Sequence, residues 1–200
     1  SDVYKRQMVN DANTDMYISF DNRMVGEIMA QSMEEAIPDG GKIFMIQGSA
    51  TDNNVAMVKE GFEDTLQGSN LQVVYEANCE GWTAELAVDY VEEALEEYPD
   101  VKGIFATNET VADLVVNVLD SMDKTTGEDR IKVVSFDGGE DQMKLLEDGK
   151  IDGLIVQNPY GIGYATVVAC ARAVLGQGNE ATVSLSLIHI SEPTRRTPIS

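Results

Sequence analysis

The stretch 133–161, VVSFDGGEDQMKLLEDGKIDGLIVQNPYG, indicates most clearly which fold this chain adopts. It holds two short apolar runs separated by an amphipathic segment, a pattern typical of two parallel strands joined by a helix. The first run ends at Asp137 and the second at Gln157, so a polar side chain stands at the end of each buried strand. Ligands of open α/β sheets bind at the carboxyl ends of the strands. The stretch therefore predicts one wall of a ligand site as well as part of a sheet.

The same alternation of strand-like and helix-like segments extends through most of the chain. Apolar, partly β-branched runs predict strands at 16–20, 43–47, 71–75, 101–106, 131–136 and 154–157. Apolar residues at helical spacing predict helices at 86–98 and 111–122, and a last apolar helical stripe within 164–175. Strands that alternate with helices predict an α/β fold, a parallel sheet with helices on both faces.

Both ends of the chain differ in character from the part between them. Residues 1–7 and 185–200 resemble translated sequencing-adapter sequence, so we expect them to be artefacts and residues 8–184 to be a partial domain. The two ends hold four basic and two acidic residues, so without them the net charge changes from −21 to −23. Such an acidic surface repels nucleic-acid phosphates, so no nucleic-acid partner is expected. The only histidine, His189, lies in the C-terminal tail, so neither histidine catalysis nor histidine ligation is expected.

Motifs for catalysis and nucleotide binding are missing. No G-x-G-x-x-G follows a strand, and there is no G-x-S-x-G turn. Cys79 and Cys170 match neither a metal spacing nor a disulfide framework, and Cys170, in an apolar helical run, is expected in the core. No stretch is long and apolar enough to span a bilayer. We therefore expect no enzymatic activity, no cofactor, no metal and no direct membrane insertion.

Polar and aromatic side chains stand at the ends of several predicted strands. Asp21, Asn108 and Asp137 follow the first, fourth and fifth strands, Gln157 closes the sixth, and Trp82 follows the third. An Asp or Asn after a strand often caps the next helix, and capping is the favoured interpretation of Asn108 or Asp21 taken alone. Trp82 could likewise pack at the start of a helix. As a group, however, these side chains suit a sugar, because planar polar groups pair with adjacent hydroxyls and an indole covers the apolar face of the ring.

From residue 17 to about residue 176, the chain resembles the ribose-binding-like family of periplasmic sugar-binding proteins, which serve ABC importers. Besides 133–161, the matching segments are YISFDN (17–22), KIFMIQG (42–48), KEGF (59–62), YPDV (98–101) and FATNE (105–109). The resemblance implies a type I periplasmic-binding-protein fold, in which two α/β lobes close on the ligand. It also implies that about 22–156 form most of the second lobe, and that 8–21 and 157–184 are remnants of the first.

The resemblance also assigns roles to individual residues. The family's stacking aromatic falls on Trp82, its hydroxyl-binding residues on Asn108, Asp137 and Gln157, and its crossover aspartate on Asp21. Ribose binders usually have an arginine at the position of Ala56, so Asn54 or Asn53 is expected to compensate. This departure leaves the identity of the sugar open.

The resemblance implies a non-enzymatic, monomeric solute-binding component of an ABC importer, with a sugar-like ligand and membrane permease subunits as partners. Its expected location is periplasmic or extracellular, with or without a lipid anchor. Three alternatives remain open: the effector domain of a LacI-type regulator, the sensor domain of a receptor, and an α/β enzyme whose catalytic half lies elsewhere. The sequences GKIDG (149–153) and QNPY (157–160) favour transport over regulation.

Overall fold

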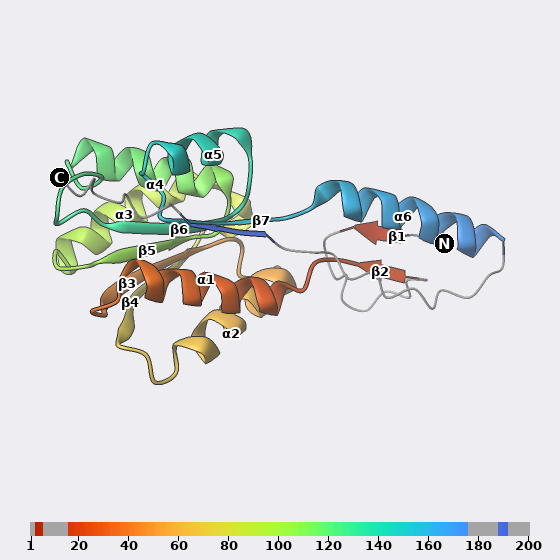
Figure 1. Cartoon of the computed structure of the whole chain (residues 1–200), viewed down its shortest axis with the longest axis horizontal. Helices are drawn as coiled ribbons and strands as arrows, with labels where there is room; N and C mark the ends of the chain where they lie inside the picture. Colours follow the sequence, from red (N-terminus) through yellow and green to blue (C-terminus); the bar gives the residue numbers. More distant parts are fainter. Residues whose placement is uncertain (1–2, 6–15, 176–187, 192–200) are drawn as a thin grey trace, which may run out of the picture.

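Strands and helices alternate along the chain in the computed structural model, as the sequence predicts (Figure 1). The structure describes residues 3–5, 16–175 and 188–191, with side chains over 18–175. The elements are β1 (Val3–Lys5), β2 (Met16–Ile18), α1 (Asn22–Ala36), β3 (Gly41–Gln47), α2 (Asn53–Leu66), β4 (Leu71–Asn78), η1 (Glu80–Trp82), α3 (Leu86–Glu97), β5 (Gly103–Ala106), α4 (Glu109–Ser121), β6 (Lys132–Asp137), α5 (Glu140–Glu147), β7 (Gly153–Val156), α6 (Pro159–Val174) and β8 (Ile188–Ser191). Each of the six predicted strands is present.

The main sheet has the strand order β4-β3-β5-β6-β7-β8. All neighbours are parallel except β7 and β8, which are antiparallel, so the predicted parallel sheet is confirmed. Because β3 lies between β4 and β5, the strand order reverses there. In open α/β sheets a crevice forms at such a point, outside the carboxyl ends of the strands.

Two short strands fall in the tails that the sequence predicts to be artefacts. β1 pairs with β2 in a separate parallel sheet, and β8, which contains His189, pairs with β7. Both are joined to their partners through backbone hydrogen bonds, which any non-proline residue can supply. Because this pairing does not depend on the side chains, it does not test whether the tails are artefacts, and that assignment remains a prediction.

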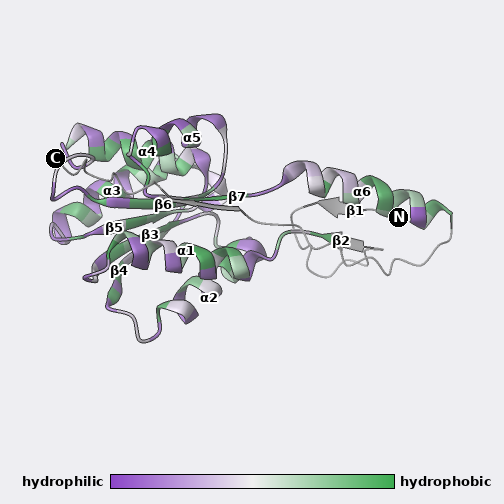
Figure 2. Cartoon of the chain, viewed as in Figure 1, coloured by the Kyte–Doolittle hydropathy of each residue, from purple (hydrophilic) through white to green (hydrophobic). Residues whose placement is uncertain are grey.

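Helices cover both faces of the main sheet (Figure 1). Successive residues of a strand point to opposite faces, so Ile43 and Met45 of β3 pack against α1 and α2. Phe44 and Ile46 pack with the helices α3, α4 and α5 on the other face. Figure 2 shows the result: the strands β5 and β6 are mainly hydrophobic, whereas the outer surface of α5 is hydrophilic.

The helices α1 and α2 cross with their backbones in contact. A Cβ atom on Gly26 would overlap the carbonyl oxygen of Val58, and one on Gly61 would overlap the carbonyl oxygen of Arg23. Each helix therefore has a glycine where the other approaches. This close crossing holds the first turns of α1 and α2 side by side, where Asn22 and Asn54 are in hydrogen-bond contact.

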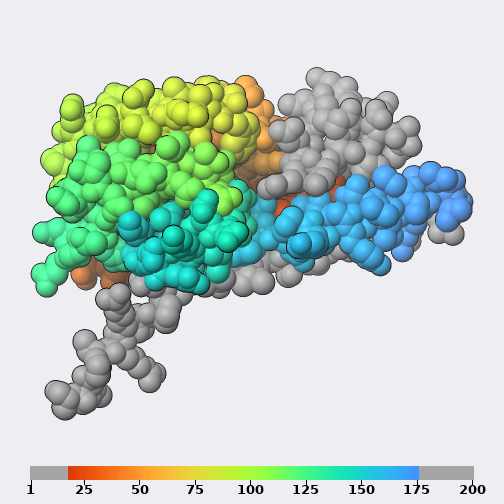
Figure 3. All heavy atoms as spheres, turned by 90° about the horizontal axis from the view of Figure 1, so that it is seen from above, coloured from red at the N-terminus to blue at the C-terminus, as the bar shows by residue number. Residues whose placement is uncertain are grey.

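Helix α6 extends away from the main sheet (Figures 1 and 3). Its buried residues Ile162, Ala165 and Ala169 pack on Ile18 and Phe20 in a small cluster of their own. No helix within the described ranges combines the length and apolar character needed to cross a bilayer.

The predicted apolar stripe on α6 lies mostly on the surface. Tyr164 is 76% exposed, Val167 69% and Val174 86%. Cys170 is exposed as well, so its expected place in the core is wrong. The reason is helical geometry: Ala169 faces the small cluster, and the next residue is turned by about 100° away from it. We predict that this stripe packs against the sheet of the first lobe.

Asp113 on α4 provides a test of pH-dependent stability. Its Oδ1 is buried without a hydrogen-bond partner, and burial, together with the charges of Asp141 and Glu109, raises the pKa of its carboxyl group. A raised folded-state pKa favours the neutral acid, so the contribution of Asp113 to stability is full at low pH and is lost as the pH rises through that pKa. We expect Asp113→Asn to raise the melting temperature at about pH 7 by about 2 °C, with the gain vanishing near pH 4, as measured by calorimetry.

Asp120 is the matched control, because the pKa of its carboxyl group is lowered by hydrogen bonds from Lys150 and Thr125. Its contribution is present at neutral pH and is lost as the pH falls through the folded-state pKa. Asp120→Asn is therefore expected to lower the melting temperature at neutral pH. If both variants shift the melting temperature in the same direction there, our explanation of Asp113 is wrong.

Candidate ligand-binding site

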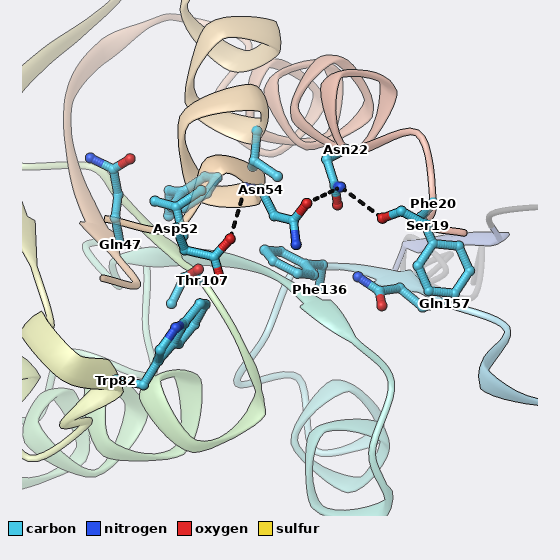
Figure 4. Close-up of a pocket in the computed structure, with 13 residues that line it drawn as sticks. Ser19, Phe20, Asn22, Gln47, Asp52, Asn54, Trp82, Thr107, Phe136 and Gln157 are labelled. Atoms are coloured by element: carbon cyan, nitrogen blue, oxygen red, sulfur yellow. Dashed lines mark hydrogen bonds between the residues drawn. The ribbon is translucent and has the colours of Figure 1, made fainter. Parts of the chain in front are cut away.

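A cavity of about 290 Å³ lies at the carboxyl ends of the central strands (Figure 4). This volume is close to the lower end of the range for small-molecule sites, roughly 300 to 1,000 Å³. Its polar lining residues are Ser19, Asn22, Gln47, Asp52, Asn54, Thr107 and Gln157. Its apolar and aromatic lining residues are Phe20, Val55, Val58, Trp82, Phe105 and Phe136. The cavity lies where β3 and β5 are neighbours, at the reversal of strand order.

Three of the six predicted site residues line this cavity. Trp82, Asn54 and Gln157 come from η1, the first turn of α2 and the end of β7, and the fold brings them together. Gln157 is buried, with 7% of its surface exposed, and its backbone N–H donates to the carbonyl of Asp137 at 3.1 Å. The ends of β6 and β7 are thereby joined, as expected for the two strands of the stretch 133–161.

Asp21 and Asn108 cap helices instead of lining the cavity. The Oδ1 of Asp21 accepts a hydrogen bond from the backbone N–H of Met24 at 3.0 Å, at the start of α1. The Oδ1 of Asn108 accepts one from the N–H of Val111 at 2.9 Å, at the start of α4. The capping interpretation is confirmed for both residues. Their contact with a ligand remains a prediction.

Asp137 lies at the end of β6 in an unusual backbone conformation, with φ 127°, and it does not line the cavity. The turn after it is held by Gln142, whose side chain is fully buried. The Oε1 of Gln142 accepts from the N–H of Gly138 at 2.8 Å, and its Nε2 donates to the carbonyl of Phe136 at 3.1 Å. A strained residue in a well-fixed turn is typical of functional sites, so a role for Asp137 in ligand binding remains our prediction.

Trp82 is also held in a strained conformation. Its φ is 61°, in the left-handed region that bulky residues rarely adopt, and Gly81 before it has the same φ. The indole lies against Gly48, where a Cβ atom would overlap the ring carbons. With 40% of its surface exposed, Trp82 leaves part of its ring available at the cavity.

Glu80 connects the turn that carries Trp82 with the loop between β3 and α2. Its carboxylate accepts hydrogen bonds from the Oγ of Ser49 at 3.2 Å and from the N–H of Ala50 at 3.4 Å. The N–H of Gly81 donates in turn to the same Ser49 hydroxyl at 3.4 Å. The indole and the first turn of α2 are therefore positioned by one shared network.

Gly48→Ala tests whether the contact with Gly48 positions the Trp82 ring for ligand binding. The added methyl group would occupy the space of the ring carbons, so the ring must move toward the cavity. In the complete protein with both lobes, we expect the affinity for the sugar-like ligand that the resemblance implies to fall about tenfold, roughly 1.4 kcal/mol, as measured by calorimetric titration. Gly68→Ala is the control for a loss of stability alone, because an alanine is strained at its φ of 88° but nothing lies within 4 Å of a Cβ there. Equal effects of the two substitutions on affinity would contradict the proposed support.

Sequence reasoning missed several residues that line the cavity. Gln47 closes β3 and Thr107 follows β5, so the rule that singled out Gln157 would have found them. Asn22 is the first residue of α1, and Asp52 is the N-cap residue of α2. The crossing of the two helices brings Asn22 beside the start of α2 at the cavity.

The cavity offers hydrogen-bond acceptors, hydrogen-bond donors and an aromatic face. Asp52 supplies a carboxylate, Asn54 and Gln157 supply carboxamides, and Trp82 supplies the ring. In the described part of the chain, no three His, Cys, Asp or Glu side chains gather in a way that could hold a metal ion. Such a set has the chemistry to pair with a neutral molecule that carries several hydroxyl groups.

The fold and the cavity together indicate an α/β domain with a cavity of small-molecule size. The chain belongs to the periplasmic binding protein domain family, whose model matches residues 3–178. It is 32% identical over 118 residues to the D-xylose-binding periplasmic protein of Escherichia coli K12, a match that covers 56% of this chain and 36% of that protein. It is 25% identical over 180 residues to the ribose import binding protein RbsB of Haemophilus influenzae, covering 90% and 60%. The matches thus span 36% and 60% of these two curated relatives, less than two thirds of each.

Solved structures show the same fold. A carbohydrate transporter solute-binding protein from Agrobacterium radiobacter, in complex with D-arabinose, superposes with a TM-score of 0.86 at 22% identity, covering 98% of this chain and 68% of the other. An ABC transporter solute-binding protein from Burkholderia graminis, also in complex with D-arabinose, gives a TM-score of 0.81 at 25% identity, covering 90% and 63%. The type I periplasmic-binding-protein fold that the resemblance implied is therefore confirmed.

Proposed function

We propose that this chain is the greater part of the second lobe of a solute-binding protein that delivers a sugar or sugar-like molecule to an ABC importer. The observation that carries the proposal is the cavity at the carboxyl edge of the sheet, with the Trp82 indole and the polar side chains of Asp52, Asn54 and Gln157 in one lining. The names of the relatives, which include xylose-binding and ribose import proteins, support the same function. In this proposal a first lobe completes the site, and "the two-lobe protein" below means that complete form.

The chemistry of the cavity supports a neutral sugar over an anionic ligand. Asp52 lines the cavity with a carboxylate that would repel a phosphate or a carboxylate group. The carboxamides and the carboxylate match hydroxyl groups, which donate and accept hydrogen bonds. The indole suits the apolar C–H face of a sugar ring.

The alternatives are less well supported. The net charge of −21 disfavours close contact with nucleic acid by this lobe, and the named relatives are periplasmic or import proteins. Transport is therefore preferred over a LacI-type regulator, a receptor sensor or an enzyme. The proposal includes a monomeric protein in the periplasm or outside the cell, with permease subunits as its membrane partners.

A thermal-shift screen of the two-lobe protein against pentoses, hexoses and polyols tests the proposal, followed by calorimetric titration of any sugar that stabilises it. We expect at least one monosaccharide to bind with micromolar or tighter affinity. Binding of none of them would contradict the proposal. The 200-residue chain alone is expected to bind poorly, because it lacks the opposing lobe, and millimolar or tighter binding by it would disprove the assignment to half a site.

A further inference from the structure

We propose that Asn22 is a positioning residue of the ligand site: it orients the Asn54 carboxamide so that Nδ2 donates to a ligand hydroxyl beside the Asp52 carboxylate. The inference deepens the proposed function and rests on it for the identity of the ligand. The orientation of Asn54 itself can be tested without any ligand.

The contact between the two asparagines joins two helices. Asn22 is the first residue of α1 and has only 6% of its surface exposed. Its Nδ2 donates to the Oδ1 of Asn54 at 2.9 Å and to the Oγ of Ser19 at 3.2 Å (Figure 4). Because the glycine-mediated crossing fixes α1 against α2, these two first turns have little freedom to separate.

The direction of this hydrogen bond determines which end of Asn54 faces the ligand. A carboxamide has a donor end and an acceptor end, and Asn22 engages the acceptor end. Figure 4 shows the amide nitrogen of Asn54 pointing away from Asn22, toward Phe136 and the cavity. Asn54 is thereby presented to the cavity as a hydrogen-bond donor.

The carboxylate of Asp52 explains why a hydrogen-bond donor from Asn54 suits a ligand hydroxyl. Asp52 lines the same cavity, and its side chain accepts a hydrogen bond from the backbone N–H of Asn54 at 2.9 Å. The side chains of Asp52 and Asn54 therefore start from neighbouring points at the beginning of α2. A hydroxyl group has one hydrogen, and once that hydrogen is given to a carboxylate the oxygen can only accept. A donor from Asn54 completes this pairing, whereas an inverted carboxamide would present a second acceptor to the same hydroxyl.

The side chain at position 22 can be changed so that its hydrogen bonding is reversed. Asn22→Asp replaces the donor with a carboxylate, which can only accept and therefore attracts the Nδ2 of Asn54. The variant is expected to fold, because α1 has no acidic residue in its first turn and a helix amino terminus favours one. Asn22→Ala removes the contact without adding charge.

The test is a double-mutant cycle in the two-lobe protein, with D-ribose, D-xylose and D-arabinose titrated calorimetrically into the wild type, Asn22→Asp, Asn22→Ala, Asn54→Ala and the two double variants. We expect Asn22→Asp to weaken binding by about 10- to 100-fold and Asn22→Ala by about 3- to 10-fold. In the Asn54→Ala background, either change should alter affinity by less than about twofold. An Asn22→Asp variant with wild-type affinity, or with the same loss in the Asn54→Ala background, would overturn the inference.

A measurement on the 200-residue chain separates this inference from the proposed function. The side-chain NH₂ resonances of Asn54, assigned by their loss in Asn54→Asp, are expected to shift strongly in Asn22→Asp and little in Ser121→Ala, a change remote from the cavity. If these resonances shift but no sugar binds the two-lobe protein, the proposed function fails while the orientation by Asn22 stands. Unshifted Asn54 resonances would refute the orientation whatever the protein binds.

Discussion

Trp82→Ala is expected to weaken sugar binding by the two-lobe protein by about 30- to 100-fold, or roughly 2 to 3 kcal/mol. The substitution removes the aromatic face of the cavity, and with it both the apolar contact area and the match to the C–H face of a sugar. Calorimetric titration is the appropriate measurement, because Trp82 is the only tryptophan of this chain and the variant loses that fluorescent reporter. For the same reason, the wild-type emission spectrum is expected to change when ligand is added.

Stability should respond differently from affinity in this variant. Trp82 is 40% exposed, so its removal costs the fold little. Met122 is a matched control, because it is 39% exposed and lies outside the cavity. Met122→Ala should leave affinity unchanged. Wild-type affinity in Trp82→Ala would refute the assignment of the indole to the ligand site.

Asp152→Ala is expected to lower the free energy of unfolding of the 200-residue chain by about 3 kcal/mol, as measured by urea denaturation. The Asp152 side chain is only 8% exposed and forms a double hydrogen bond with Arg130, which is 14% exposed. The carboxylate also accepts the N–H of Val133 at 3.0 Å and lies 3.3 Å from the Nζ of Lys132. Its removal leaves a buried guanidinium without its counter-charge.

An exposed ion pair provides the control for Asp152. Asp100 pairs with Lys42 at 2.9 Å, but 62% of its side chain is exposed, so Asp100→Ala should cost far less stability than Asp152→Ala. Asp152 directly precedes β7, at the amino end of that strand and opposite the edge with the cavity. Sugar affinity at low temperature should therefore survive Asp152→Ala in the two-lobe protein. Equal costs for the two substitutions would show that burial does not strengthen the Asp152 pair.

Much of the fold could be predicted from short-range pattern. Buried parallel strands are apolar throughout, which is why the runs that include Ile43 to Gln47 and Leu154 to Val156 were recognisable. The hydrophobic pattern of the sequence could not show which apolar helix face is buried, because burial depends on the element that packs against that face. The stripe of α6 and Cys170 were for this reason indistinguishable from core residues, although both are exposed.

The site was predictable in part, for a similar reason. The end of a strand marks a place on the sheet edge, so Gln157 was identified from the sequence and Gln47 could have been. A residue after a strand can cap a helix, line the cavity or, like Asp52, do both, and the sequence does not show which. Asp21 caps α1 and does not line the cavity. No sequence motif pointed to Asn22 as a site residue, because its importance lies in a contact with Asn54, a residue 32 positions away.

The paired glycines of α1 and α2 have a consequence for how such a protein acquires new ligands. Gly26 and Gly61 let two backbones touch, so the distance between the first turns is set by main chain and not by adaptable side chains. Exchanging Asn54 can therefore alter ligand recognition without changing the helix crossing, whereas even an alanine at either glycine would push the two helices apart. Libraries for altered sugar preference are best confined to the tips of these helices, with their crossing kept constant.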